Sequence, residues 1–451
     1  MRSIRVIALA ITALLVISAC SAGGTTSPEA SVAAPSDVPA SSAPSAAASE
    51  APAALSGTLT VWDWQFTSER WGAALKAIDE AFVAANPDVT IDHVGQPNDT
   101  YYQLVQAANS AQSGPDVAMM HAGTFGVLNY PESLAPLNDY ITDDVRASLD
   151  GWESVGAGFD PNGTIYGVAG SRSGWVFYYN KALFEQAGLD PETPPATWDE
   201  LVDAATKLKA AGITPFGGGN ADGWGNLQYL NILFPGAFSA EESLALAKGE
   251  IKYTDPKFKD VNQKFLDLVA AGFFEPGYAS TLLWTEGVQQ FGAGRQAMIA
   301  GIASDTVSYN EFNAALGEEN VGVFYAPSIT QPEPYIPDSA GPVWTITNYA
   351  RDKDLAWAYI EFLTGPEGAR LQYEMAGVLP INKGYTPPDS APAQVKQMVN
   401  DFNTKPTLLY VSSLMKQAVV FDWMKQIQSV QAGDLSLDDA LAAVQAVQDQ
   451  P

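Results

Sequence analysis

The fold is decided early in the chain, by the stretch TLTVWDWQFTSERWGAALKAIDEAFVAANPDVTIDHV (58–94). Apolar residues alternate with threonine at its start, a pattern that predicts a buried strand. Over 70–85 the apolar residues instead recur at helical spacing, which predicts a helix with one apolar face. Asn86-Pro87-Asp88 end that helix, and VTIDHV (89–94) has the composition of a second strand.

The same alternation continues beyond this stretch. A helical pattern at 101–111 is broken by Gly114-Pro115, and DVAMMH (116–121) follows as a third apolar strand. Strand, helix, strand, helix, strand at this spacing predicts a parallel sheet with helices on its faces, and therefore the α/β class.

Further strands and helices are predicted along the rest of the chain. The clearest helix is 197–212, where Thr197 and Glu200 fit a capping box and Gly212 closes the pattern. Several strands arrive late, which indicates that the chain crosses between two lobes more than once. The remaining predicted strands are 166–168, 175–180, 297–300, 321–325 and 343–347, and the remaining predicted helices are 258–271, 354–363, 366–375, 391–402 and 435–447.

The chain begins with the features of a secretory signal. Arg2 and Arg5 precede an apolar run at 6–17, which is too short to cross about 30 Å of hydrocarbon. The run ends in Ile17-Ser18-Ala19-Cys20, which resembles the lipobox of bacterial lipoproteins. That resemblance implies cleavage of a signal peptide at 1–19 and lipid attachment to Cys20, the only cysteine of the chain.

The segment that follows, 20–56, is composed almost entirely of Ala, Ser, Pro, Gly and Thr. It cannot bury enough apolar surface to offset chain entropy, and it therefore predicts a lipid-anchored flexible tether. A single cysteine excludes an intrachain disulfide, so a large apolar core must stabilise the folded body.

Charge and motif content exclude several classes of protein. The net charge of −28 argues against binding of nucleic acid or of anionic lipid surfaces. The two histidines, His93 and His121, have no cysteine near them, so no metal site is expected, and no cofactor motif is present. The glycine-rich stretch GGGNADGWG (217–225) lacks the lysine of a P-loop.

Several stretches, taken in order, carry a family resemblance. They are SGPDVAMMH (113–121), GTIYGVAGSRSGWVFYYNKALFEQAGLD (163–190), PPATWDELVDAATKLKAAGITPF (194–216), FGAGRQAMIAG (291–301) and GVLPINKG (377–384). The chain resembles the family 1 extracellular solute-binding proteins of ABC importers, the sugar-binding group that includes maltose-binding protein. The likeness covers essentially all of 57–385 and weakens toward the C-terminus.

The resemblance implies a two-lobed, type II periplasmic-binding-protein-like fold. Each lobe is expected to contain a mainly parallel sheet flanked by helices, and the chain is expected to cross the hinge three times, near 168–172, 326–330 and 363–366. The expected N-terminal lobe comprises 57–170 and 328–364, and the expected C-terminal lobe comprises 171–327 and 365–451.

The resemblance also implies a function. A mono- or oligosaccharide would bind between the lobes of a monomer outside the cytoplasm, the lobes would close, and the closed form would deliver the sugar to an ABC permease. No catalytic residue is expected, because the protein would bind its ligand without altering it.

A sugar site needs aromatic rings for the apolar faces of the pyranose and polar partners for its hydroxyls. In α/β sheets such groups gather beyond the carboxyl ends of strands. Two sets of candidates follow predicted strands: Trp64, Gln65 and Phe66 after the first, and His121 and Thr124, with Gly123 and Phe125 beside them, after the third.

Other candidates come from loops that the resemblance places near the cleft. Trp224 is the preferred stacking ring, because glycines beside it let the backbone approach a ligand. Trp71, Trp198 and Trp357 are assigned to packing, while the roles of Trp284 and Trp423 stay open. The further candidates are Arg172, Ser173, Trp175, Asn220, Asp222, Ser304, Asp305, Gly341 and Trp344.

Two alternatives remain at this point. The same fold could bind a polyamine, a metal chelate or a peptide, and Asp63 and Asp222 beside tryptophans could loosely supply a polyamine site. A secreted glycoside hydrolase would need two carboxylates across a cleft, and no local motif nominates such a pair.

Overall fold

The computed structural model describes residues 54–97, 100–156, 162–303 and 309–450. The signal peptide, Cys20 and nearly all of the tether lie outside the described residues, as do the candidates Ser304 and Asp305. Within the described ranges, no helix combines the length and the apolar character that crossing a membrane requires.

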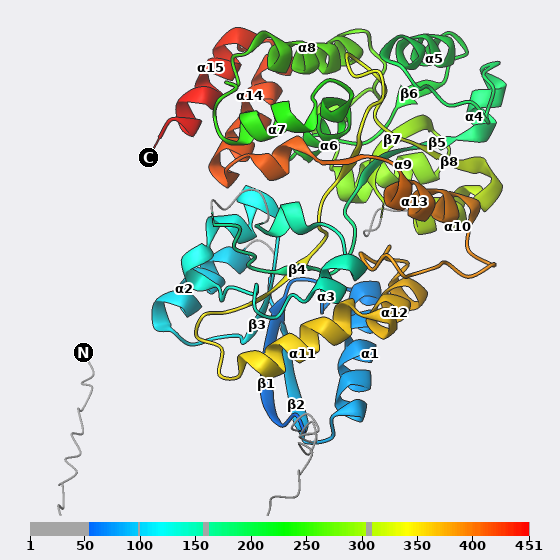
Figure 1. The fold of residues 1–451 in the computed structure, drawn as a ribbon. Helices are drawn as coiled ribbons and strands as arrows, with labels where there is room; N and C mark the ends of the chain where they lie inside the picture. Colours follow the sequence, from blue (N-terminus) through cyan, green and yellow to red (C-terminus); the bar gives the residue numbers. More distant parts are fainter. Residues whose placement is uncertain (1–53, 98–99, 157–161, 304–308, 451) are drawn as a thin grey trace, which may run out of the picture. The chain divides into compact units, whose positions relative to one another are not determined.

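The first sheet has five strands in the order β2-β1-β3-β10-β4 (Figure 1). β1 runs parallel to both β2 and β3, as the opening stretch of sequence predicts. β10, a strand from late in the chain, lies between β3 and β4 and runs antiparallel to both. The strands are β1 (Gly57–Asp63), β2 (Val89–Gly95), β3 (Val117–Met120), β4 (Val168–Ala169) and β10 (Val343–Ile346).

Helices α1 (Glu69–Ala85), α11 (Lys353–Thr364) and α12 (Pro366–Ala376) accompany this sheet. The apolar stripe of α1 is buried as predicted, and α12 packs against both α1 and α11 although it lies far along the chain (Figure 1). We call the residues packed on this sheet the first lobe. α2 (Tyr101–Ala111) also belongs to it, through the buried side chains of Tyr101 and Val105.

The second sheet has four strands in the order β6-β7-β5-β8. β5 is antiparallel to β7 and to β8, and β6 and β7 form the parallel pair. The expectation of a mainly parallel sheet is therefore wrong for this lobe. Local pattern predicts a strand, but its direction depends on where the chain re-enters the sheet. The strands are β5 (Trp175–Asn180), β6 (Thr214–Phe216), β7 (Gln296–Ile302) and β8 (Val321–Phe324).

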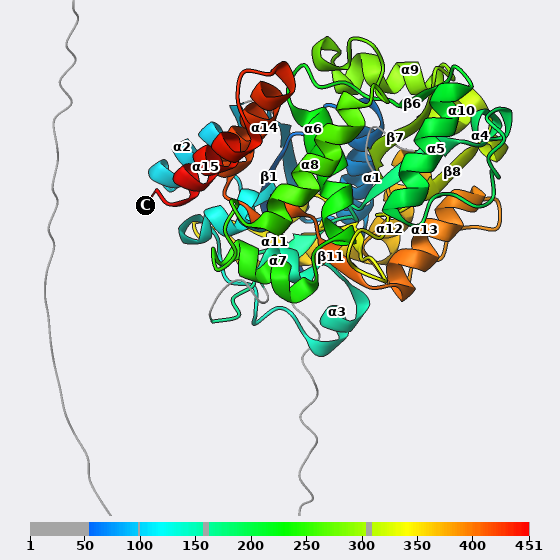
Figure 2. The same ribbon diagram turned by 90° about the horizontal axis from the view of Figure 1, so that it is seen from above.

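The second lobe comprises the residues packed on this sheet. α5 (Trp198–Ala210) begins with the predicted capping box, in which Thr197 and Glu200 bond each other's backbone N–H groups. Figure 2 shows α14 and α15 lying alongside α6 and α8, and an apolar core joins them. The bounds are α6 (Trp224–Leu233), α8 (Pro256–Ala270), α14 (Gln417–Ala432) and α15 (Leu437–Gln448).

The chain passes between the sheets three times. The first passage is 170–174, and the second is 325–342, which contains the short strand β9 (Ile336–Asp338). The third follows α12 and leads to α13 (Ala393–Thr404), which packs near β8. We expected the third passage at 363–366, but Gly365-Pro366 separates two helices that stay with the first sheet.

Candidate ligand-binding cavity

A cavity of about 520 Å³ lies where the two lobes meet. Its walls come from the loops after β1 and β3 in the first lobe and from β5, α6 and the late segment 410–420 in the second. The lining residues are Trp64, Gln65, His121, Ala122, Phe125, Ser173, Trp175, Trp224, Leu227, Asn231, Trp284, Ile302, Tyr410, Ser412, Ser413 and Val420.

The first-lobe wall is built on stacked rings. Trp64 lies nearly parallel to the imidazole of His121, with ring centroids 4.5 Å apart and an interplanar angle of 13°. The Tyr101 ring meets Trp64 edge-on at 5.0 Å and supports it from behind. Burial lowers the pKa of His121 to about 4, so this histidine is uncharged at neutral pH.

The second-lobe wall carries three tryptophans. Trp175 begins β5, Trp224 begins α6, and Trp284 lies in the π-helical turn η8 (Leu283–Gly287). Tyr410 packs edge-on against Trp175 with centroids 6.0 Å apart. The buried indole N–H of Trp175 has no hydrogen-bond partner within the described part of the chain.

The lining is uncharged. Across the described residues that line the cavity there is no Lys, Arg, Asp or Glu, and the polar groups are amides, hydroxyls and the neutral His121. Asn231 accepts a hydrogen bond from the backbone N–H of Ser412 through Oδ1 (3.2 Å). The arrangement can bind a neutral molecule that has both apolar faces and hydroxyl groups.

Known proteins with similar sequences and structures agree with this arrangement. The family model described as bacterial extracellular solute-binding protein matches residues 67–370. The chain is a bacterial extracellular solute-binding protein. It is 26% identical over 423 residues to the sn-glycerol-3-phosphate-binding periplasmic protein UgpB of Shigella dysenteriae, covering 85% of this chain and 90% of that one.

Solved structures support the fold of this solute-binding protein. A chitin oligosaccharide binding protein has a TM-score of 0.75 and 25% identity, covering 87% of this chain and 98% of that one. The cyclic alpha-maltosyl-1,6-maltose binding protein of Arthrobacter globiformis has a TM-score of 0.68 at 21% identity, covering 87% and 98%. The predicted family, the two-lobed α/β fold and the placement outside the cytoplasm are thereby confirmed. The protein binds a solute and is not an enzyme.

Six of the residues predicted for the site meet in the cavity of this solute-binding protein. They come from four separate segments of sequence, which the two sheets bring together. The six are Trp64, Gln65, His121, Ser173, Trp175 and Trp224.

Four further predicted residues do not line the cavity but contact residues beside it. The Phe66 ring stacks on His93 at 3.9 Å, and Thr124 Oγ1 donates to the Ser413 carbonyl of the other lobe (3.2 Å). Asn220 is buried and Asp222 accepts from the backbone N–H of Trp224 (3.3 Å), so both shape the turn that carries Trp224.

Arg172 lies at the hinge and not in the cavity. Its buried guanidinium donates to Asp338 (2.7 Å), Asp150 (3.1 Å) and Asn403 (2.9 Å). Burial raises the pKa of Asp338 to about 6 despite the neighbouring cation. These bonds join the first and second passages to both lobes, so the residue has a structural task.

Gly341 and Trp344 are also placed away from the cavity. Gly341 packs so closely on Ser171 that a Cβ atom would lie 2.2 Å from its hydroxyl oxygen, and the Gly341 N–H donates to the Ser171 carbonyl (2.6 Å). Trp344 is 1% exposed within β10, where its indole contacts Gly170. Both stabilise the junction of the passages, and we do not retain them as ligand contacts.

Several lining residues escaped prediction. Four of them, Tyr410, Ser412, Ser413 and Val420, belong to the late segment 410–420, whose short 3-10 turn η10 (Val411–Leu414) has no periodicity to reveal it. Trp284 lines the cavity, whereas Trp423 is fully buried and donates through Nε1 to Asn262 (2.9 Å), which answers the two open assignments.

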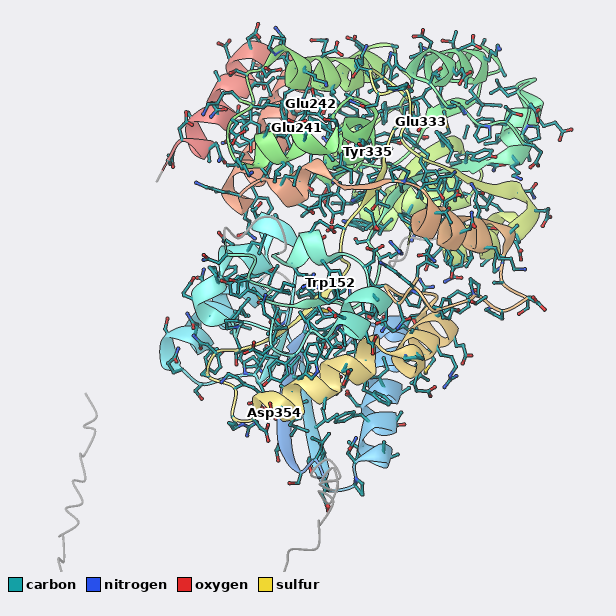
Figure 3. All side chains as sticks on the ribbon, viewed as in Figure 1. Trp152, Glu241, Glu242, Glu333, Tyr335 and Asp354 are labelled. Carbon is teal, nitrogen blue, oxygen red and sulfur yellow. The ribbon has the colours of Figure 1, made fainter. Side chains whose placement is uncertain are left out.

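A second cavity, of about 340 Å³, lies on the other side of η10. Glu153 and Ser154 line it from the first lobe, directly after Trp152, and Ala240 lines it from α7 (Ala240–Ala247) directly before Glu241 and Glu242 (Figure 3). Leucines and three carboxylates line it without an aromatic ring, so it lacks the stacking surface of the larger cavity.

Proposed function

We propose that this protein captures a neutral carbohydrate in the cavity between its lobes. The observation that carries the proposal is the combination of tryptophan rings on both walls with a lining whose described residues carry no charge. Pyranose rings present apolar C–H faces that stack on aromatic rings, and their hydroxyls match the amides and serines between the rings. The chitin oligosaccharide binding protein, which is similar in structure, supports a sugar ligand.

The lack of charge on the described cavity lining favours a neutral carbohydrate over two charged solutes, a phosphate ester and a polyamine. UgpB is named for sn-glycerol-3-phosphate, and a phosphate ester calls for cationic or densely N–H-lined partners. A polyamine calls for carboxylates, yet Asp63 is buried behind the wall and Asp222 caps a turn. The described lining offers neither kind of charge, which favours a neutral ligand.

Closure and delivery form the second part of the proposal. Thr124 contacts Ser413, and Phe125 lies 5.9 Å from Phe421, so residues of both lobes meet beside the cavity. We assign 57–170 and 328–376 to the first lobe and 171–327 and 377–451 to the second. The expected boundary after residue 364 is thus moved to the end of α12, because α12 packs on α1. The closed protein would deliver sugar to an ABC permease as a monomer.

We also propose a lipid anchor on Cys20, which follows from the lipobox-like sequence. Acyl chains on that sulfur would hold the protein at the outer face of the cell membrane, with 20–56 as the tether. A Cys20→Ser variant should lose incorporation of a labelled fatty acid and leave the membrane fraction. Retention of the label would disprove this anchor.

The experiment that tests the ligand is a thermal-shift and calorimetry panel. Chito-, xylo- and maltooligosaccharides are compared with sn-glycerol-3-phosphate and spermidine. A true ligand at a hundredfold excess over Kd stabilises the folded state by about 2.7 kcal/mol. We expect stabilisation by at least one oligosaccharide, and a response confined to the phosphate ester or to spermidine would overturn the proposal.

A further inference from the structure

The turn that carries Trp64 and Gln65 into the cavity is held by one buried carboxylate. Asp63 ends β1 and is fully buried. Its Oδ1 accepts from the backbone N–H of Gln65 and from that of Phe66, the latter at 2.5 Å. The path of the turn therefore depends on how the Asp63 carboxylate is oriented.

His93 on β2 fixes that orientation. Its Nε2 donates to Asp63 Oδ2, and its Nδ1 donates to Asp79 Oδ2 on α1 at 2.7 Å, with the imidazole side chain 2% exposed. An ionised carboxylate only accepts, so both ring nitrogens carry hydrogen and the ring is an imidazolium. Burial opposes that charge, but the bonds to Asp63 and Asp79 outweigh it and raise the pKa of His93 to about 9.

Tyr359, Phe66 and Trp344 surround the hydrogen-bonded group formed by Asp63, His93 and Asp79. Asp79 Oδ1 accepts from the Tyr359 hydroxyl of α11 (2.6 Å). The Phe66 ring stacks on the imidazole with an interplanar angle of 16°, and Trp344 of β10 meets it edge-on at 6.5 Å. The charged groups facing His93 are thus Asp63 and Asp79, and the buried hydroxyl of Tyr359 completes the chain of hydrogen bonds.

In the second lobe, the turn that carries Trp224 is held mainly by amide groups. The backbone N–H of Asn226 donates to Asn220 Oδ1 (2.9 Å), and Asn226 Nδ2 donates to Gln431 Oε1 (2.8 Å). Gln428 Nε2 donates to the Asn220 carbonyl (2.7 Å). These amides, with Asp222 accepting from the Trp224 N–H (3.3 Å), hold the turn before Trp224 without a histidine, which provides a control inside the same molecule.

We propose that His93 is the positioning residue of the first-lobe turn: held between Asp63 and Asp79, it orients the Asp63 carboxylate and thereby places Trp64 and Gln65 in the cavity. The inference rests on the proposed function only for the reason why Trp64 and Gln65 need to be held in place, which is to contact the ligand. The hydrogen bonds of the arrangement all lie within the protein, so they can be tested without a ligand.

The test is hydrogen exchange, measured by mass spectrometry on the folded protein and on the variants His93→Gln, Asp79→Asn and Tyr359→Phe. His93→Gln loses a hydrogen bond between charged groups, so we expect the peptide containing Gln65 and Phe66 to exchange at least about tenfold faster in this variant. Asp79→Asn should have a smaller effect and Tyr359→Phe the smallest. The peptide at 217–227 should exchange at its original rate.

Two results would overturn the proposal. One is unchanged exchange at Gln65 and Phe66 in folded His93→Gln, and the other is equal acceleration of the two turns, which would indicate general destabilisation. Should His93→Gln fail to fold, the other two variants decide: faster exchange in Asp79→Asn than in Tyr359→Phe supports the proposal, and the absence of this order overturns it. NMR titration adds a separate readout, because Asp79→Asn should lower the pKa of the His93 ring. A failed carbohydrate panel would leave these results unaffected.

Discussion

The indole of Trp175 brings a buried N–H to the wall of the cavity. The side chain is only 6% exposed, and no acceptor for Nε1 exists among the described residues. A buried donor without a partner costs about 1–3 kcal/mol, so a ligand oxygen that accepts from it would gain affinity and direction. The neighbouring rings supply contact area, whereas this group can distinguish one hydroxyl arrangement from another.

Replacement of Trp175 by phenylalanine should therefore weaken carbohydrate binding. The variant keeps an aromatic ring against Tyr410 but removes the donor, and we expect a loss of about 1 kcal/mol, or roughly fivefold in Kd. Isothermal titration with the best oligosaccharide of the panel measures the effect. An unchanged Kd would show that Nε1 does not contact the ligand.

Trp224 should contribute through stacking. Its ring lies at the start of α6 with Phe421 edge-on at 6.4 Å, so truncation removes a surface and leaves the sheet core in place. Trp224→Ala should weaken binding by about 0.5–1.5 kcal/mol, with little change in melting temperature. Trp198→Phe, at a tryptophan outside the cavity, is the control, and equal losses in both variants would contradict the assignment.

At the scale of elements, the helices and strands follow from sequence more directly than the site does. β5 was predicted at its observed bounds, and α2 likewise, because burial periodicity is a local property. The direction of β5 and the lobe that receives α12 depend on long-range pairing, which periodicity does not encode. The segment 410–420 contributes lining residues from an irregular turn, so no local signal could assign it.

The capping box of α5 provides a test at this scale. Thr197 Oγ1 accepts from the Glu200 N–H, and the Glu200 carboxylate accepts from the Thr197 N–H (3.0 Å), so Thr197→Ala removes half of a reciprocal cap. We expect a loss of about 1 kcal/mol in the free energy of unfolding, measured by denaturant titration, with ligand affinity unchanged. Thr206→Ala, on the exposed side of the same helix, should cost less; equal costs would argue against the cap.

At the scale of the whole molecule, the two histidines differ in pKa, which is about 4 for His121 and about 9 for His93. His121 is a neutral ring in the cavity wall, and His93 is a buried cation on β2 between Asp63 and Asp79. Both were visible in the sequence, but only His121 was a site candidate there. The two hydrogen-bond partners of His93 come from two separate elements, β1 and α1, and only the folded structure shows that they converge.

The raised pKa of His93 predicts that the folded protein loses stability at alkaline pH. The pKa of His93 is about 9 in the folded state and near 6.5 when unfolded, so the native state binds the extra proton between those values. Stability is fully present below pH 6.5 and should fall by up to about 3 kcal/mol as pH rises through 9. Denaturant titrations at pH 6.5 and 9.5 measure it. His93→Gln should show a flatter profile, and an equally steep one would contradict the assignment.

The bonds of Arg172 constrain how the protein can open. Its backbone N–H donates to the Leu379 carbonyl of the third passage (3.0 Å), while its guanidinium grips Asp338 of the second and reaches Asp150 and Asn403 in opposite lobes. Because Arg172 is bonded to both lobes, it can serve as the pivot of their relative rotation. We therefore expect the lobes to open by rotation about this residue and not by sliding past each other.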